Sequence, residues 1–442
     1  MKKPIKYTLI IILFFAALPI FPQSGMKYSE FAKKLETYFH PDLIDDITQS
    51  LTRTDFTVWS WDVGDFSDDG HNDVAFAIRR LGNKDRNMDV YMFADIDGYL
   101  VNVGQFKYEF VELPLEVGVA FRYGVLYVTQ KFKQFNWKID GFKLTGGSLL
   151  YYDRYNTSRI GKYTHETYTN YYALRNTEKY LQTANSKTDF WTDYYSITSY
   201  RRNRFIYKGI TDDTFVNDIA FCPEGAYWWQ GDSDLSYYVS SAYDDDFLYF
   251  TVLVVDDKVV QPYNNIENGE QIELYINPTN YDLEADRFAE VKDDNVKFLN
   301  IANGNDTNIY KIQIFVGDFI HKEPTMSITN GIGIKYMNEN VITDLTDNGY
   351  YAIFKIPFTA FKHKTLPLQG DEFMQWAATV RVIDVDNEFK PKQRTVLQTS
   401  NYMDENSATL GNIIFIPDEK WYGEATNIYM DKIVSLLESI GF

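Results

Sequence analysis

The chain has 442 residues, with 43 basic and 62 acidic side chains and a formal net charge of −19 at pH 7. Such a charge argues against nucleic acid and anionic lipid as partners, because both demand a positive protein surface. A single cysteine, Cys222, excludes an intramolecular disulfide, so stability must come from packing or from bound metal.

The N-terminus has the layout of a secretory signal peptide, with lysines ahead of an apolar run over residues 9–21. This run is shorter than the roughly 20 apolar residues of a bilayer span, although an uncleaved N-terminal anchor stays open as an alternative. We expect residues 1–24 to be removed and the mature protein to be exported. Its location would be the periplasm, the cell surface or the medium, without membrane insertion after signal cleavage.

Residues 25–155 are predicted to form a β domain with a helical cap. Apolar residues recur every four positions from Phe31 to Phe39, and Pro41 opens a second helical pattern. From Phe56 onward, short alternating runs are separated by Gly, Asp and Asn, which is typical of strands joined by tight turns. Aromatic residues, 17% of the chain, also favour pleated and half-buried strands.

The segment GDFSDDGHNDVAF places oxygen-bearing side chains alternately around a tight turn. The candidate calcium ligands are Asp65, Ser67, Asp69, the carbonyl of His71, and Asp73, with Gly70 at the turn. The segment resembles the calcium loop of FG-GAP and VCBS type repeats, which implies a bound Ca²⁺, although we find one copy where propellers have several. The alternative is an acidic Asp-Gly hairpin that binds no metal.

The remaining chain divides into three expected segments. Residues 156–204 are polar and rich in Tyr, Thr and Asn, without clear periodicity, and we expect them to connect two domains in a partly extended form. Residues 205–417 form a second β-rich block. Residues 418–442 carry an apolar stripe at helical spacing, which predicts a C-terminal helix docked on its own domain.

The block 205–417 resembles family 9 carbohydrate-binding modules in the order and wording of several strand-like runs. These include SSAYDDDFLYFTVLVVDD, GEQIELYINP and GYYAIFKIPFTAF, the last ended by Pro357. We read GEQIELYINP as a strand with Glu270 and Glu273 on one face and Ile272 on the other. The resemblance implies an antiparallel β-sandwich that recognises sugars by aromatic stacking and by charged and amide hydrogen bonds, often with bound calcium.

The resemblance also implies which polar residues contact a sugar. Carried over position by position, they are Asp256, Asp257, the segment from Gln261 to Tyr263, Asp384, Asp386 and Arg394. At two positions where members often carry a stacking Trp, this chain has the pair Glu267 and Asn268, and Leu397. Trp228 and Trp229 lie in a polar loop and cannot both point inward from an extended segment, so one of them is the candidate replacement platform.

The sequence contains no phosphate loop, zinc-protease motif or serine elbow, so we expect no enzyme. The leading hypothesis is an exported carbohydrate-binding protein with a calcium-binding N-terminal domain. The alternative is a cell-surface or envelope assembly protein that uses the sandwich as a scaffold for protein partners. A weaker alternative is haem binding through His321 and Met326.

Overall fold

The computed structural model describes most of the chain between residues 25 and 416. The described residues are 25–51, 55–80, 87–133, 136–145, 148–201, 214–262, 265–281, 289–298, 308–330, 333–362, 364, 374–402 and 407–416. The expected signal peptide and C-terminal helix lie outside them. The fold is mostly β, as predicted, and the chain forms two compact units: residues 1–159 with 164–172, and residues 160–163 with 173–442. In the described part of the chain, no helix is long and apolar enough to cross a membrane.

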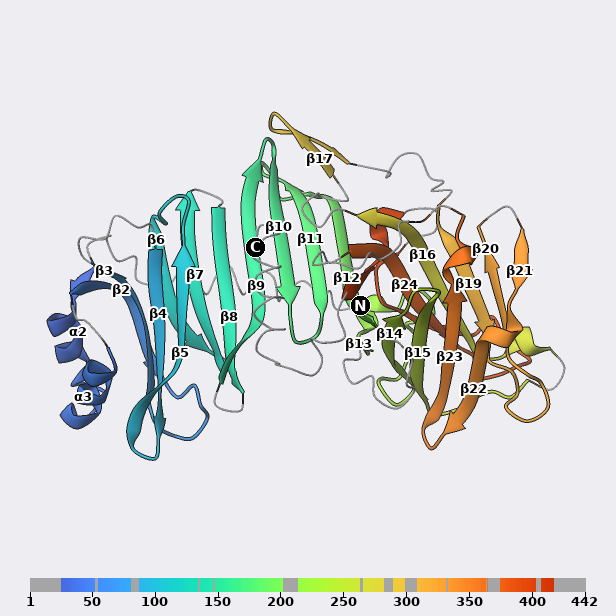
Figure 1. The fold of residues 1–442 in the computed structure, drawn as a ribbon, viewed down its shortest axis with the longest axis horizontal. Helices are drawn as coiled ribbons and strands as arrows, with labels where there is room; N and C mark the ends of the chain where they lie inside the picture. The colour runs from blue at the N-terminus through green and yellow to red at the C-terminus, as the bar shows by residue number, and fades with distance from the viewer. Residues whose placement is uncertain are drawn as a thin grey trace. The chain divides into compact units, whose positions relative to one another are not determined.

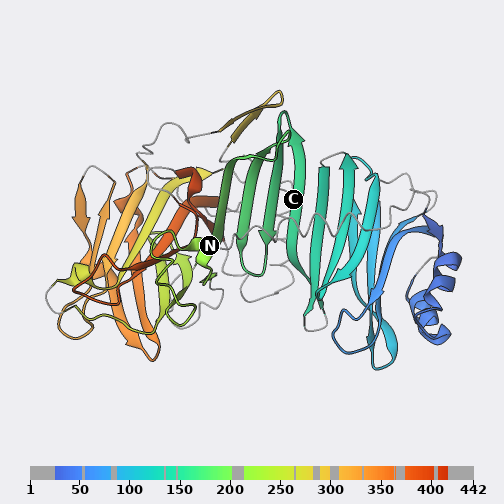
Figure 2. The same cartoon turned by 180° about the vertical axis from the view of Figure 1, so that it is seen from behind.

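The N-terminal unit begins with the predicted helical cap. Helices α2 (Tyr28–Leu35) and α3 (Pro41–Ser50) lie beside the first sheet in both views (Figures 1 and 2). Pro41 starts α3 because a helix tolerates proline in its first turn, where the N–H has no helical partner. Phe31 and Leu35 of α2 are fully buried against the sheet, so the predicted spacing of four marks the packed face.

Two antiparallel sheets follow in this unit. The first has the order β1 (Met26–Lys27), β2 (Phe56–Gly64), β3 (Asp73–Arg80), β4 (Asn87–Ile96) and β5 (Tyr99–Glu109). The second contains β6 (Glu116–Arg122), β7 (Val125–Lys133), β8 (Asn136–Thr145) and β9 (Ser148–Ile160), and β10 (Tyr163–Asn170) comes next in the chain. Their inner faces share a core that includes Met92, Val128 and Phe142.

The segment expected to connect two domains consists of strands. Within residues 156–204, the structure places the end of β9, then β10, β11 (Arg175–Gln182) and β12 (Thr188–Arg201). Most side chains of β10 and β11 are half-buried, whichever face they occupy. Alternating hydropathy arises only where one face is buried and the other solvated, so these strands leave no period-two signal.

The C-terminal unit is the predicted β-sandwich. Its first sheet contains β13 (Thr214–Val216), β14 (Leu235–Tyr243), β15 (Phe247–Asp256), β23 (Gly349–Pro357) and β22 (Val341–Thr346). Its second contains β26 (Asn412–Ile416), β24 (Met374–Asp384), β16 (Gln271–Tyr281), β19 (Tyr310–Phe315), β20 (Thr325–Thr329) and β21 (Ile334–Tyr336), with β25 (Thr395–Gln398) beside the end of β24. A separate hairpin is formed by β17 (Ala289–Lys292) and β18 (Asn295–Phe298). The inner faces of the two sheets pack around fully buried side chains such as Phe250 and Trp376.

One strand departs from the antiparallel pattern. The second half of β12 pairs in parallel with β14 and, on its other edge, with β26. Ser199 is opposite both Ser241 and Phe415, and its side chain is buried. The sandwich therefore includes a strand that precedes residue 205, which we had expected to be its start.

Candidate functional site

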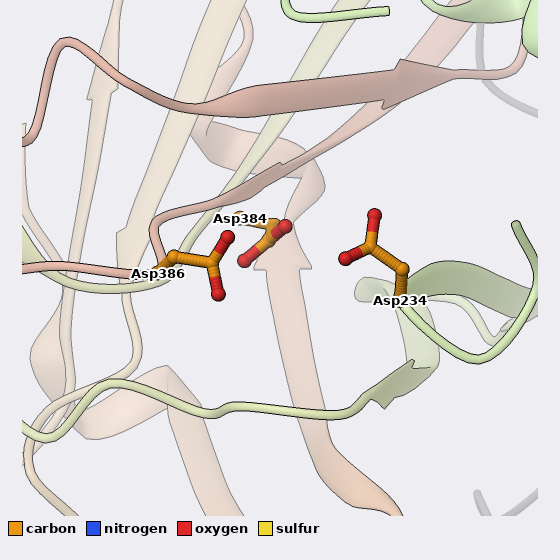
Figure 3. A group of neighbouring side chains, drawn as sticks. All are labelled: Asp234, Asp384 and Asp386. Atoms are coloured by element: carbon orange, nitrogen blue, oxygen red, sulfur yellow. The ribbon is translucent and has the colours of Figure 1, made fainter. Parts of the chain in front are cut away.

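Four strands of the sandwich bring carboxylates together at one end. Asp256 ends β15 and pairs with Leu235, so Asp234 lies beside it just before β14. Gln271 pairs with Ile383, so Glu270 and Asp384 meet where β16 begins and β24 ends. The carboxylate oxygens of Asp256, Glu270 and Asp384 lie within 4.8 Å of one another. Asp234, Asp384 and Asp386 form a second such group, and their carboxylates turn toward one another in Figure 3.

The inner group, Asp256, Glu270 and Asp384, is buried, and within the described part of the chain none of the three forms an ion pair with a cationic side chain. In the outer group, Lys258 Nζ lies 3.8 Å from Asp386 Oδ1. Burial raises the pKa of Asp256 to about 6, and neighbouring carboxylates add to the effect. Burial and the adjacent carboxylates also raise the pKa values of Glu270 and Asp384 well above their ordinary range. Oδ2 of Asp256 and Oδ1 of Asp384 accept no hydrogen bond from the described residues. Crowded carboxylates with unused oxygens are a donor set that suits a hard divalent cation such as Ca²⁺.

The same carboxylates hold the adjoining loops. Glu270 accepts hydrogen bonds from the backbone N–H of Val260 (3.1 Å) and of Val385 (3.3 Å). Oδ1 of Asp256 accepts one from Lys258 N–H at 2.7 Å. Anything that stabilises these carboxylates in place therefore also fixes the loop after β15 and the loop between β24 and β25.

An aromatic loop precedes β14. The side chains of Tyr227 and Trp228 are 93% and 44% exposed, with ring centroids 6.3 Å apart and planes at 85°. Trp229 instead packs against the sandwich core and donates from Nε1 to the carbonyl of Leu235 at 2.7 Å. The two adjacent tryptophans thus point in different directions, and Trp228 is the one available for stacking.

Arg394 forms an ion pair with Glu224, the residue at the start of this aromatic loop. Its guanidinium donates to both carboxylate oxygens of Glu224, at 2.9 and 3.0 Å, and this bond lowers the pKa of Glu224. Gly225 follows with a φ of +78°, and a Cβ there would lie 2.0 Å from the carbonyl oxygen of Arg394. The loop can approach β25 this closely only because residue 225 is glycine. The predicted residues Trp228 and Arg394 are therefore brought into one region.

The outer face of the second sheet adds a polar cluster that the sequence analysis missed. Glu273, which is buried, lies 2.6 Å from Lys311 Nζ and 3.4 Å from Arg381 Nη1, and it accepts a hydrogen bond from the hydroxyl of Tyr275. Glu273 and Tyr275 also contribute to the raised pKa of Arg394, so the cluster adjoins the Arg394 region. The available signal was the period of two, which places Gln271, Glu273 and Tyr275 on one face.

Our expectation that Glu270 and Glu273 share a face was wrong. Residues three apart in a strand point to opposite faces, because the side-chain period is two. The structure accordingly places Glu270 among the buried carboxylates and Glu273 in the polar cluster on the outer face. These two acids therefore belong to separate sites.

The other predicted sugar contacts fall in different places. Asp384 is buried among the carboxylates, Gln261 is exposed in the loop after β15, and Tyr263 lies outside the described residues. Leu397 is part of the sandwich core. Of the haem candidates, Met326 is fully buried in that core while His321 lies in an exposed turn, so the structure offers no support for a shared ligand set.

The acidic loop of the N-terminal unit lies between β2 and β3. The buried carboxylate of Asp73 accepts hydrogen bonds from the N–H groups of Phe66, Ser67 and Asp95, and burial raises its pKa. Asp65 accepts from the N–H groups of Asp69 and Gly70, and Asp69 accepts from His71. An ionised carboxylate offers about four lone-pair sites, so these bonds leave acceptor capacity. Neither of the two converging carboxylate groups in the described residues includes this loop, and its calcium site stays a prediction.

Among known proteins, only solved structures are found to be similar to this chain. Neither the models of protein families nor the curated proteins give a match. Two solved structures of a family 9 carbohydrate-binding module from Caldicellulosiruptor kristjanssonii, in complex with cellotriose and with glucose, are similar to the chain at 11% and 12% identity. Each covers 52% of this chain, and 98% and 99% of the module, with a TM-score of 0.31. Sequence identities and a TM-score this low say nothing about activity.

Proposed function

We propose that the protein is an exported, non-catalytic carbohydrate-binding protein whose aromatic loop contacts the sugar. The observation that carries the proposal is the exposed pair Tyr227 and Trp228, held beside the bidentate ion pair of Glu224 and Arg394. A ring stacks on the apolar face of a sugar, and the charged pair exchanges hydrogen bonds with its hydroxyl groups. The sequence resemblance to family 9 modules supports the same function.

We propose further that Ca²⁺ binds among the carboxylates at the end of the sandwich. Asp256, Glu270 and Asp384 would hold one ion, and Asp234 and Asp386 extend the donor set through the shared Asp384. The ion would neutralise buried like charges and thereby fix the loops that Glu270 and Asp256 anchor through Val260, Val385 and Lys258. Calcium then acts as a structural support for the sugar-binding loops.

The function is tested with the purified full chain. Glycan arrays and pull-down on insoluble polysaccharides, in millimolar Ca²⁺ and again after chelation, should reveal binding that calcium strengthens. Uniform silence from correctly folded, calcium-loaded protein would overturn the proposal. A stable complex recovered from envelope fractions without any sugar dependence would instead favour the assembly role. Export is tested separately by locating the mature protein after cell fractionation.

Asp69→Ala is expected to abolish a calcium-dependent stabilisation of the N-terminal unit. We propose that the Asp65 loop binds Ca²⁺, and a ligand that binds only the folded state adds RT ln(1 + [L]/Kd), about 2.7 kcal/mol at 100 times Kd. The stability of this unit should be measured by hydrogen exchange of peptides from β2 and β3, with and without calcium. Asp97→Ala, in the neighbouring β4–β5 turn, is the matched control. If wild type and Asp69→Ala respond identically to calcium and chelator, the loop is an acidic hairpin.

A further inference from the structure

The outer face of the second sheet of the N-terminal unit carries a row of three paired residues. Tyr127 of β7 is opposite Gly141 of β8, and Gly141 is opposite Asp153 of β9. Paired residues share a face, and the adjacent residues Leu126 and Phe142 point into the core, so this row faces outward. Tyr168 of β10 reaches the same place and donates from its hydroxyl to Asp153 Oδ2 at 3.3 Å.

Gly141 leaves a notch in this face. A Cβ on Gly141 would lie 2.1 Å from Asp153 Oδ1 and 3.1 Å from Cε1 of Tyr127. The missing side chain therefore lets the carboxylate lie over β8, between two tyrosine rings. Asp153 is only 9% exposed, yet no described residue donates a hydrogen bond to Oδ1. One oxygen of a nine-tenths buried carboxylate is thus left for a ligand.

The charges around Asp153 select the chemistry of that ligand. Burial raises the pKa of Asp153 to about 6; Tyr168 and Lys143 act against the shift, and Asp140 adds to it. Burial also raises the pKa of Tyr127, with further contributions from Asp153, Tyr168 and Tyr152, so these groups are neighbours. Lys143 opposes a cationic ligand, and Asp153 itself opposes an anionic one, while the charge of Asp140 is paired with Arg154 at 2.5 Å. A neutral polyhydroxyl compound with an apolar face satisfies the carboxylate and the rings together.

The aromatic surface continues along the strands. Successive outward rows contain Trp137 opposite Thr157, then Tyr155 opposite Ile139, and then Tyr127 in the row of Asp153. Rows on one face are about 7 Å apart, because each residue advances the strand by about 3.3 Å. The three rings belong to the neighbouring strands β8, β9 and β7, so they are spread across this face and offer apolar surface to more than one sugar residue.

We propose that Asp153, Tyr127 and Tyr168 form a second saccharide-binding site, in the N-terminal unit and independent of the aromatic loop in the sandwich. The carboxylate accepts hydroxyl protons from the sugar, and the tyrosine rings flank its apolar face. Burying the carboxyl group of Asp153 costs folding free energy, because its ionised form loses water. Functional sites commonly carry such a cost.

The test uses the full chain and three variants: Asp153→Asn, Trp228→Ala and the double variant. Titration calorimetry with cellohexaose, xylohexaose and laminarihexaose should find two sites in the wild type for at least one of these probes. Asp153→Asn should weaken one site at least about 10-fold, since a hydrogen bond to a charged group is lost. Trp228→Ala should weaken the other, and the double variant should bind at neither. Tyr172→Ala, an exposed tyrosine of the same unit, is the control and should change nothing.

A pH series separates binding from folding. The affinity of the Asp153 site should rise as pH increases through about 6, because the ionised carboxylate is the better acceptor, and Asp153→Asn should show no such rise. Burial raises the pKa values of Tyr127 and Tyr168 further above this range. Lys143, Asp140 and Tyr152 are the other titratable groups that act on Asp153 and its tyrosine neighbours. Stability should move in the opposite direction: Asp has a raised pKa when folded, so its contribution is complete below the unfolded pKa and is lost through pH 6. Asp153→Asn should therefore be no less stable than wild type at pH 7.5.

The outcomes distinguish the two proposed sites. If Trp228→Ala loses all binding and Asp153→Asn binds like the wild type, the second site is overturned and the sandwich site stands. The reverse pattern would support the second site and overturn the sandwich site. Binding that no variant changes would overturn both, as would a wild type that binds none of the three oligosaccharides.

Discussion

Asp384→Asn is expected to have opposite effects on the C-terminal unit with and without calcium. In chelator, the variant should be more stable than wild type at pH 8. It removes a carboxyl group whose pKa is raised well above its ordinary range, and which must take up a proton or bury its charge beside Asp256 and Glu270 when the unit folds. In millimolar Ca²⁺ the order should reverse. Wild type gains about 2.7 kcal/mol at 100 times Kd, whereas the variant has lost a ligand that both carboxylate groups share.

The stability of the C-terminal unit should be measured as a function of urea concentration, with hydrogen exchange of peptides from β15 and β24 as the probe. Asp257→Asn is the matched control: it removes one exposed negative charge next to the cluster but no member of either carboxylate group. It should change the free energy of unfolding slightly and in the same direction in chelator and in calcium. A difference between Asp384→Asn and wild type that is equal in chelator and in calcium would mean that the carboxylates bind no ion.

Several strands of the sandwich could be predicted from the sequence because apolar residues that enter the core alternate along them with residues that are polar or carry a polar group. In β16, for example, Ile272 and Leu274 enter the core while Glu273 and Tyr275 face outward. The helices α2 and α3 were predictable for the same reason, at the period of 3.6. Strands β10 and β11 lack this contrast, since both faces carry half-buried side chains, and the local pattern could not identify them.

The sites were less predictable because they depend on strand ends that meet in space. Asp256 and Asp384 were predicted to be functional positions through the family resemblance. However, they are 128 positions apart in the chain (384 − 256), and nothing local indicates that their oxygens approach. Asp384 is 3% exposed, and the role first given to it, contact with a sugar, stays a prediction. The parallel pairing of β12 with β26 likewise joins residues more than 200 positions apart. Long-range pairing of this kind has no signature in a single sequence.

Trp228→Ala is expected to weaken sugar binding by the sandwich about 30-fold while leaving the unit folded. Aromatic residues at the centre of a binding surface commonly contribute about 2 kcal/mol, which corresponds to that change in Kd. The ring of Trp228 is 44% exposed, so its removal leaves only a small unfilled space in the fold. Titration calorimetry with an oligosaccharide that binds the wild type measures the change, and urea unfolding checks the stability.

Trp229→Phe is the matched control and should show the converse. Its Nε1 donates to the Leu235 carbonyl, and its ring packs against the core, so the substitution should reduce stability by about 1 kcal/mol. Its effect on sugar affinity should be small, because the platform formed by Tyr227 and Trp228 stays in place. If both tryptophan variants lose stability and neither loses affinity, the aromatic loop covers the end of the sandwich and contacts no sugar. Equal affinity losses in both would instead mean that the loop acts through its fold and that Trp228 has no separate stacking role.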